Sequence, residues 1–193
     1  MSKTYLGIIR TSLILAVSPI VIITGCNNAA PPVSVSNQPV SINGVTQPGV
    51  PPKPVAMMSW TGTDGKEQRM QDLEGKVIVL DFWATYCEPC RREIPHLNQL
   101  QAKYGSDKLQ VIGMNVGGDE DEPKIPKFVQ ELKVSYPVAF PEDSLVEYIF
   151  QGSDAIPQTA VFDRKGQFVT KIVGFDDSVR ADLENAIDKA IRQ

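Results

Sequence analysis

The stretch KVIVLDFWATYCEPCRREIP, residues 76–95, decides how this chain folds. Residues 77–82 form a run of β-branched, aliphatic and aromatic side chains around one Asp, which is typical of a strand covered on both faces. Two cysteines follow, and beyond them apolar residues recur at helical spacing: Ile94, Leu97, Leu100 and Tyr104. The sequence therefore predicts a buried strand, a Cys-Glu-Pro-Cys turn and a helix that begins at the cysteines.

This local structure favours thiol chemistry at Cys87 and Cys90. Free backbone N–H groups and the positive end of the dipole stabilise a thiolate at a helix N-terminus. A C-x-x-C pair between a strand and a helix is typical of a redox dithiol, although a zinc half-site or an inert disulfide has the same spacing. Zinc needs further ligands, and the mature chain offers only His96, because Cys26 lies far along the chain. We therefore expect redox chemistry, with no metal and no other cofactor.

The segment DFWATYCEPC, residues 81–90, resembles the active site of the thioredoxin superfamily. It is most similar to the membrane-tethered TlpA/ResA-like thiol-disulfide oxidoreductases, which also share the Leu-x-Gly-Lys of residues 73–76 and the Ile-Pro-x-Thr of residues 156–159. The resemblance covers residues 55–193. It implies one α/β domain of thioredoxin-like fold, with a central mixed sheet flanked by helices, an N-terminal β-hairpin and a central insertion.

The two cysteines are expected to have different roles. Cys87, at the start of the helix, should be the exposed nucleophile, and Cys90, one turn on, should be buried and resolve the mixed disulfide. Glu88 places a negative charge beside Cys87 and opposes its thiolate, while Pro89 suits the first turn of a helix. Both residues between the cysteines could also serve only to start the helix.

Asp81 alternates with Val77 and Val79 and so belongs to one face of the buried strand. A carboxylate buried there is costly, and burial should raise its pKa. In thioredoxins the matching acid exchanges protons with the buried thiol, so the resemblance implies a catalytic role toward Cys90. The alternative is a structural Asp with its hydrogen bonds satisfied.

Four further residues are expected to border the dithiol. Pro157 matches the cis-proline loop of the thioredoxin fold, in which the backbone of Ile156 would pair with an extended substrate; the alternative is an ordinary trans turn. Trp83 and Tyr86 are expected to flank the sulfurs and contact substrate, although Trp83 could instead belong to the core.

Residues 1–25 have a basic start, an apolar run and small residues at the end, the arrangement of a secretory signal. Ile-Thr-Gly-Cys, residues 23–26, resembles a bacterial lipobox, which implies that Cys26 is lipidated and anchors an exported protein at a membrane, facing the periplasm or the outside. The alternative is a plain signal peptide or an uncleaved helix. Residues 26–54 are rich in Pro, Ser and Asn with little charge, which predicts a flexible tether.

The remaining elements follow from periodicity and turn residues. The sequence predicts a hairpin at 55–60 and 66–70, a strand at 109–116, a helix near 125–132, a short strand within 134–140 and a helical turn at 145–150. A closing hairpin at 159–162 and 167–173 and a helix near 179–190 complete the domain. The acidic run at 119–122 should complement a helix dipole, with recognition of a basic partner as the alternative.

The formal net charge of −4 makes nucleic acid an improbable partner. The sequence favours an extracytoplasmic reductase of protein disulfides, because Glu88 disfavours the thiolate that strong oxidants stabilise. The resemblance implies a membrane thiol-electron donor and substrates that include apocytochrome c. A disulfide-forming oxidase of the same fold, or a tethered binding module with a structural disulfide, remain alternatives.

Overall fold

The computed structural model describes residues 40–42, 45–47 and 49–193. The chain divides into two units, 1–35 and 36–193, and every described residue belongs to the second. The predicted signal peptide and the predicted lipidation site Cys26 lie outside the described residues. None of the described helices is long and apolar enough to cross a membrane.

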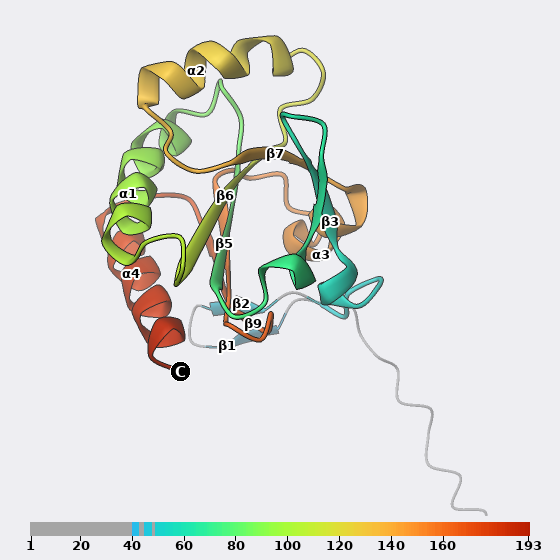
Figure 1. The fold of residues 1–193 in the computed structure, drawn as a ribbon, viewed down its shortest axis with the longest axis vertical. Coiled ribbons are helices and arrows are strands. Elements are labelled where there is room, and N and C mark those ends of the chain that lie inside the picture. The colour runs from blue at the N-terminus through green and yellow to red at the C-terminus, as the bar shows by residue number, and fades with distance from the viewer. Residues whose placement is uncertain (1–39, 43–44, 48) are drawn as a thin grey trace, which may run out of the picture. The chain divides into compact units, whose positions relative to one another are not determined.

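A seven-stranded mixed sheet organises the domain, in the order β4-β3-β7-β6-β5-β8-β9 (Figure 1). The central strands β5, β6 and β7 are parallel, and antiparallel strands extend the sheet on both sides. The strands are β3 (Ser59–Gly62), β4 (Glu67–Arg69), β5 (Val77–Trp83), β6 (Leu109–Asn115), β7 (Val138–Pro141), β8 (Gln158–Phe162) and β9 (Phe168–Val173). The predicted mixed sheet is confirmed.

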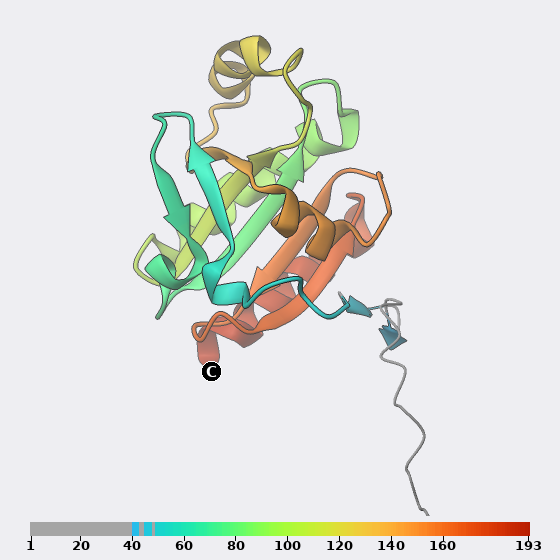
Figure 2. The same cartoon turned by 90° about the vertical axis from the view of Figure 1, so that its right-hand side faces the viewer.

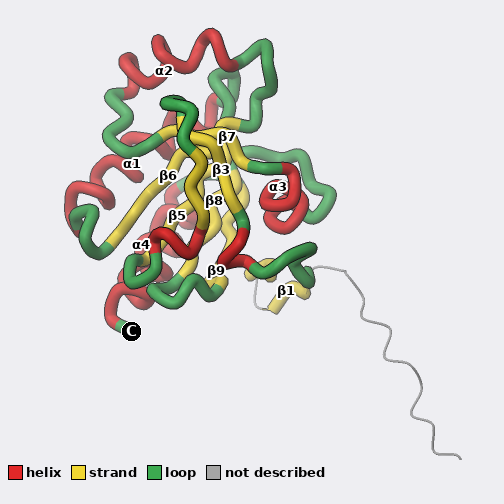
Figure 3. The backbone as a smooth tube through the Cα atoms, turned by 45° about the vertical axis from the view of Figure 1, so that its right-hand side comes forward, coloured by secondary structure: helices red, strands yellow, loops and turns green. Residues whose placement is uncertain are grey.

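Helices cover both faces of this sheet (Figures 1 and 3). On one face α1 (Glu88–Tyr104) and α4 (Asp177–Arg192) pack side by side, and residues of α2 (Ile125–Leu132) join the same apolar core. On the other face α3 (Asp143–Phe150) packs with two 3-10 turns, η1 (Val55–Met57) and η2 (Met70–Leu73). Figure 2 shows α3 in front of the sheet, with α4 behind it. The sheet therefore separates two cores.

Strand β5 is central because both of its faces are apolar and every one of its residues is buried. Val77, Val79 and Trp83 point into the core with α1, whereas residues 78, 80 and 82 point into the core with α3. This alternation places Asp81 on the α1 side, as the sequence predicts.

The parallel pairing of β5 with β6 brings two loops together. Trp83 is opposite Asn115 in the register, so the strands end at the same edge of the sheet. The Val116 N–H donates to the Trp83 carbonyl at 2.9 Å. Consequently the chain that leads into the cysteines, residues 84–87, lies beside the loop that follows β6.

The segments before β5 partly follow the sequence-based expectations. The predicted N-terminal hairpin is present as β3 and β4, although a 3-10 turn replaces its first residues, 55–57. Within the stretch predicted to be a flexible tether, β1 (Val40–Ile42) and β2 (Val45–Gln47) pair as a short antiparallel hairpin. Backbone pairing therefore provides regular structure where composition alone indicates none.

The predicted insertion between β6 and β7 is confirmed as α2, which a 3-10 turn, η3 (Glu122–Lys124), precedes. Ile125 and Phe128 of α2 are buried, whereas Val129 and Leu132 are partly buried against the same core. The strand predicted within residues 134–140 forms only at its end, as β7.

Candidate active site

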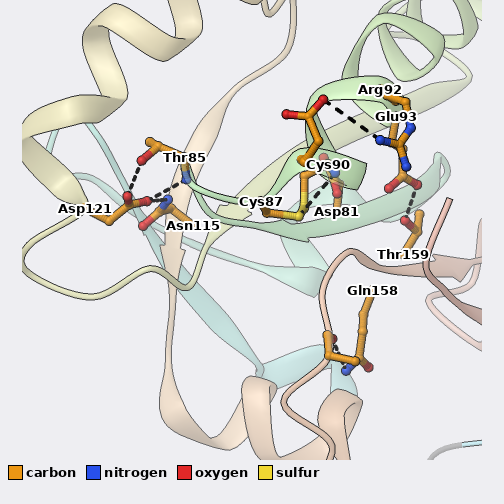
Figure 4. Close-up of a disulfide and its surroundings, with 12 residues drawn as sticks. Asp81, Thr85, Cys87, Cys90, Arg92, Glu93, Asn115, Asp121, Gln158 and Thr159 are labelled. Atoms are coloured by element: carbon orange, nitrogen blue, oxygen red, sulfur yellow. Dashed lines mark hydrogen bonds and ion pairs between the residues drawn. A yellow bond between two sulfur atoms is a disulfide. The ribbon is translucent and has the colours of Figure 1, made fainter.

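Cys87 and Cys90 form a disulfide at the N-terminus of α1 (Figure 4). Cys87 is the N-cap residue, and the backbone N–H of Cys90 donates to its sulfur at 3.2 Å. The cap satisfies one of the free N–H groups of the first turn. In the reduced protein the same N–H group would stabilise a thiolate on Cys87.

Cys87 is less exposed than the sequence predicts. Only 6% of Cys87 is exposed, and Cys90 is fully buried. Both cysteines belong to the core on the α1 side, because the bond to Cys90 keeps the sulfur of Cys87 against the start of the helix. The order of exposure agrees with the predicted roles, with Cys87 as the more accessible sulfur.

Asp81 lies behind the disulfide, on β5 (Figure 4). It is completely buried, and the Tyr136 hydroxyl donates to its Oδ2 at 3.3 Å. Its Oδ1 has no hydrogen-bond partner among the described residues. Burial raises the pKa of Asp81 to about 7, against a smaller lowering by Tyr136. Asp81 can therefore hold or release a proton near neutral pH, as the sequence predicts.

Glu93 is a second buried acid that the sequence-based interpretation missed. It is completely buried on α1, and the Thr159 hydroxyl donates to its Oε1 at 2.6 Å. Burial, and then the charge of Asp81, raise the pKa of Glu93 well above its ordinary value. A signal was present in the sequence, because Glu93 is three residues after Cys90 and adjoins Ile94 on the apolar face of the helix. A charged residue at such a position is costly unless it has a use.

Asp121 is a third buried acid, and it fixes the chain that leads into the cysteines (Figure 4). Its carboxylate accepts the backbone N–H of Thr85 at 2.9 Å, the Thr85 hydroxyl, and the side-chain amide of Asn115 at 2.9 Å. Burial alone would raise the pKa of Asp121, but the hydrogen bonds from Thr85 and Asn115 lower it overall. The loop after β6 thus holds the chain two residues before Cys87.

Asp121 does more than the dipole complementation expected of the acidic run at 119–122. Asp121 makes no side-chain cap hydrogen bond to the following helical turn, so it does not act by capping it. One partner, Asn115 at the end of β6, is near it in sequence, whereas Thr85, in the chain after β5, is 36 residues away. Gly117 makes room for the carboxylate, because a Cβ at this position would collide with Asp121. The pairing of distant segments was not visible in a single sequence.

Trp83 is a core residue and not the substrate-contacting residue that we predicted. It is completely buried and stacks on Phe128 of α2, with ring centroids 4.7 Å apart. Position 113 on β6 is a glycine, and a Cβ there would lie 2.7 Å from the indole nitrogen. The alternation of β5 directs Trp83 inward, so the structure bears out the alternative of a core position.

The other predicted site residues differ in how exposed they are. Tyr86 is 69% exposed, in keeping with a substrate-facing position. Pro157 is buried, Ile156 is partly buried, and the peptide bond between them is cis. Pro89 occupies the first turn of α1 as predicted. The side chain of Glu88 is 74% exposed and lies 3.9 Å from Arg92, so water and this cation both weaken its effect on Cys87.

This arrangement suits the exchange of one disulfide for another. A thiolate on Cys87 would attack a substrate disulfide and form a mixed disulfide; Cys90, after losing a proton, would then attack Cys87 and release the reduced substrate. Two electrons and two protons pass from the dithiol to the substrate. The buried carboxylates behind Cys90 are the groups placed to accept its proton. The fold and the site thus define a thioredoxin-like thiol-disulfide oxidoreductase.

Comparison with known proteins gives the same class. The model of the Redoxin family matches residues 28–187, and the chain belongs to this family. It is 30% identical over 129 residues to the thiol-disulfide oxidoreductase ResA of Bacillus cereus, a match that covers 67% of this chain and 72% of ResA.

Solved structures support the same fold. The chain is similar to a proposed thiol:disulfide interchange protein DsbE from Chlorobium tepidum, with a TM-score of 0.60, 32% identity, and coverage of 70% of this chain and 94% of the other. A second thiol:disulfide interchange protein of Chlorobium tepidum gives a TM-score of 0.59 at 28% identity, covering 72% and 97%. The predicted thioredoxin-like fold and the resemblance to ResA-like enzymes are confirmed.

Proposed function

We propose that this enzyme works as a reductase of disulfides in exported proteins. Its dithiol would receive electrons from a membrane thiol-electron donor, and apocytochrome c would be among its substrates. A lipid on Cys26 would hold it at a membrane, facing the periplasm or the outside of the cell. The similarity to a thiol-disulfide oxidoreductase and to thiol:disulfide interchange proteins supports the general reaction.

The charges around the dithiol are the observation that carries the reducing direction. Asp81 and Glu93 lie on the buried side of the pair, and Glu88 lies between the cysteines on the exposed side. The charge of Glu88, and that of Asp81 once it loses its proton near pH 7, opposes a thiolate and so destabilises the reduced form of the pair. A dithiol whose reduced form is poorly stabilised gives up its electrons readily, which is the property of a reductase.

The surface around Cys87 supports a polypeptide substrate. Exposed Tyr86 offers an aromatic surface beside the disulfide, and Ile156 precedes Pro157 in the loop that the family resemblance assigns to substrate pairing. An extended chain could add its backbone there in the manner of an extra strand.

The N-terminal segment supports action at a membrane. The signal and Cys26 are followed by about 28 residues; a fully flexible chain of that length has a typical reach of roughly 30 Å, and the β1–β2 hairpin within it shortens that reach. Near the end of this stretch Lys53 pairs with Glu142 at 2.7 Å, so the chain joins the domain beside the start of α3. Replacing Cys26 with Ala should release the folded protein from membrane fractions. Full retention of this variant would contradict the lipid anchor.

Redox equilibration against glutathione tests the direction. We expect a potential below roughly −200 mV, nearer to thioredoxin than to the periplasmic oxidant. The protein should also accelerate the reduction of insulin by dithiothreitol. A potential as high as that of the periplasmic oxidant would mean that the protein is an oxidase and not a reductase. If it did not accelerate insulin reduction at all, it would be a binding module with a structural disulfide.

Trapping tests the roles of the two cysteines. The Cys90→Ala variant should attack substrates through Cys87 and accumulate mixed disulfides, because nothing resolves them. The matched Cys87→Ala variant should trap none. Equal trapping by both variants would contradict the assignment of Cys87 as the nucleophile and Cys90 as the resolving cysteine.

A further inference from the structure

A groove lies beside the dithiol, on the side of α3. It has a volume of about 650 Å³, and its walls come from Tyr86, Val116, the outer side of α3 and the loop of residues 152–156. A second hollow of about 390 Å³ adjoins it and shares Val116, Asp143 and Val146. We call these two hollows together the acidic groove.

The groove begins next to the reactive pair. Tyr86 precedes Cys87, and Ile156 packs against the core that contains both cysteines; both residues line the groove. Phe150 and Val146 add apolar surface along its floor. A polypeptide whose disulfide reaches Cys87 would therefore lay the residues next to its cysteine in this groove.

The charged residues of the groove all have the same sign. Five carboxylates line the two hollows, Asp119, Glu122, Asp143, Glu147 and Asp154, and no Lys, Arg or His does. All five residues are exposed. None of the five forms an ion pair with any Lys or Arg of the described chain. The groove thus presents unpaired negative charge around an apolar floor.

We propose that the acidic groove binds the part of the substrate polypeptide next to its disulfide, and that it selects segments that combine Lys or Arg with an apolar side chain. This rests on the proposed function, since it names the class of substrate for the same site. Complementary charge on the rim raises the association rate and discriminates against acidic segments, while the apolar floor holds the segment once it has bound.

Binding can be tested separately from reduction. Three labelled peptides of equal length would each contain one apolar residue and a Ser in place of the Cys. They would differ only in the flanking residues, which would be Lys/Arg, Gln or Glu. Fluorescence anisotropy would follow their binding to the oxidised protein. We expect the basic peptide to bind most tightly, with an advantage that shrinks in high salt. Equal binding of the three peptides would overturn the proposal.

Two double variants separate the groove from the overall charge of the protein. Glu147→Gln with Asp154→Asn removes two carboxylates from the groove, and should weaken binding of the basic peptide roughly 3- to 10-fold. Asp107→Asn with Asp182→Asn removes two exposed carboxylates that do not line the groove, and should leave binding unchanged. Equal losses in both double variants would mean that net charge alone attracts the peptide.

The insulin assay keeps this proposal distinct from the proposed function. If the protein reduced insulin but bound the three peptides equally, the proposed role of the groove would be wrong and the proposed reductase function would stand. Preference for the basic peptide without reduction of insulin would support the groove as a binding site and overturn the reductase. Disulfide-bonded forms of the three peptides should be reduced in the same order in which their Ser analogues bind.

Discussion

Buried carboxylates lie on two sides of the dithiol, and the protein holds them in opposite ways. Behind the disulfide, Asp81 and Glu93 each receive one hydrogen bond, and each keeps one oxygen without a partner among the described residues. Beside it, Asp121 accepts hydrogen bonds from the backbone and hydroxyl of Thr85 and from Asn115. The pKa is accordingly raised for the first two acids and lowered for Asp121. The number of donors decides whether a buried acid stores a proton or anchors a loop.

The largest expected effect is on the pH dependence of stability. The pKa of Asp81 rises from 3.8 to about 7 on folding, so between these pH values the folded protein holds a proton that the unfolded chain has lost. The free energy of unfolding should therefore fall as pH rises from about 4 to about 7, by on the order of 4 kcal/mol. Denaturant unfolding of the oxidised protein at several pH values in this range would measure the change in the free energy of unfolding.

The Asp81→Asn variant is the matched control for this slope. It cannot lose a proton, so it should be the more stable protein at pH 7 and should show a shallower slope. Some slope should remain, because Glu93 acts in the same direction. A wild-type stability that does not change between pH 4 and 7 would show that neither acid holds a proton in the folded state.

The next effect is on turnover. Asp81→Asn combined with Glu93→Gln removes both candidate proton acceptors but keeps their shapes, and should slow insulin reduction on the order of 100-fold. Each single variant should lose less, because the other acid remains close to Cys90. The readout is the rate of mixed-disulfide resolution between pH 6 and 9. A double variant with the wild-type rate and pH profile would make both acids structural.

The same comparison explains what the sequence could predict. The period-2 pattern of β5 reveals the buried strand and also the burial of Asp81, because strand alternation is a local property. Glu93 could have been found in the same way from helical spacing. The role of Asp121 could not, because its partner Thr85 meets it only when the parallel strands β5 and β6 end at one edge of the sheet.

Other differences have similar physical causes. Trp83 was expected to flank the sulfurs and contact substrate, with a core position as the alternative, and the alternation of β5 directs it inward. The low exposure of Cys87 depends on the disulfide and on packing against α1, which spacing does not encode. The acidic groove brings together α3 and two separate loops, and so required the tertiary structure.

A smaller effect is expected for the anchoring acid. Asp121→Ala leaves the N–H of Thr85 and the amide of Asn115 without their acceptor, and should lower the free energy of unfolding by about 2 kcal/mol. It should also speed amide hydrogen exchange at Thr85. Asp119→Ala, an exposed neighbour, is the control and should change stability by less than about 0.5 kcal/mol. Equal losses would contradict an anchoring role.

Acid titration sharpens this part of the comparison. The pKa of Asp121 is lowered from 3.8 on folding, so its contribution is present above that pH and is lost as pH falls below it. Asp121→Asn should therefore make the acid limb of the stability curve shallower. The variant should still lose stability in acid, because Glu142 contributes to the same limb. Burial would raise the pKa of Glu142, but hydrogen bonds with Lys53 and Ser59 lower it to about 2.

The smallest effect is expected from the acid at the surface. Glu88 is 74% exposed and lies 3.9 Å from Arg92, so solvent and a cation screen its charge. Glu88→His should still lower the pKa of the Cys87 thiol and make the pair more oxidising, but by less than about 30 mV, a tenfold change in the equilibrium with glutathione. Glu88→Gln separates loss of the acid from gain of the imidazole, and should shift the potential in the same direction by a smaller amount. If Glu88→His shifted the potential more than the Asp81→Asn and Glu93→Gln double variant does, the exposed charge would govern the reducing character, and the buried carboxylates would be left with proton transfer alone.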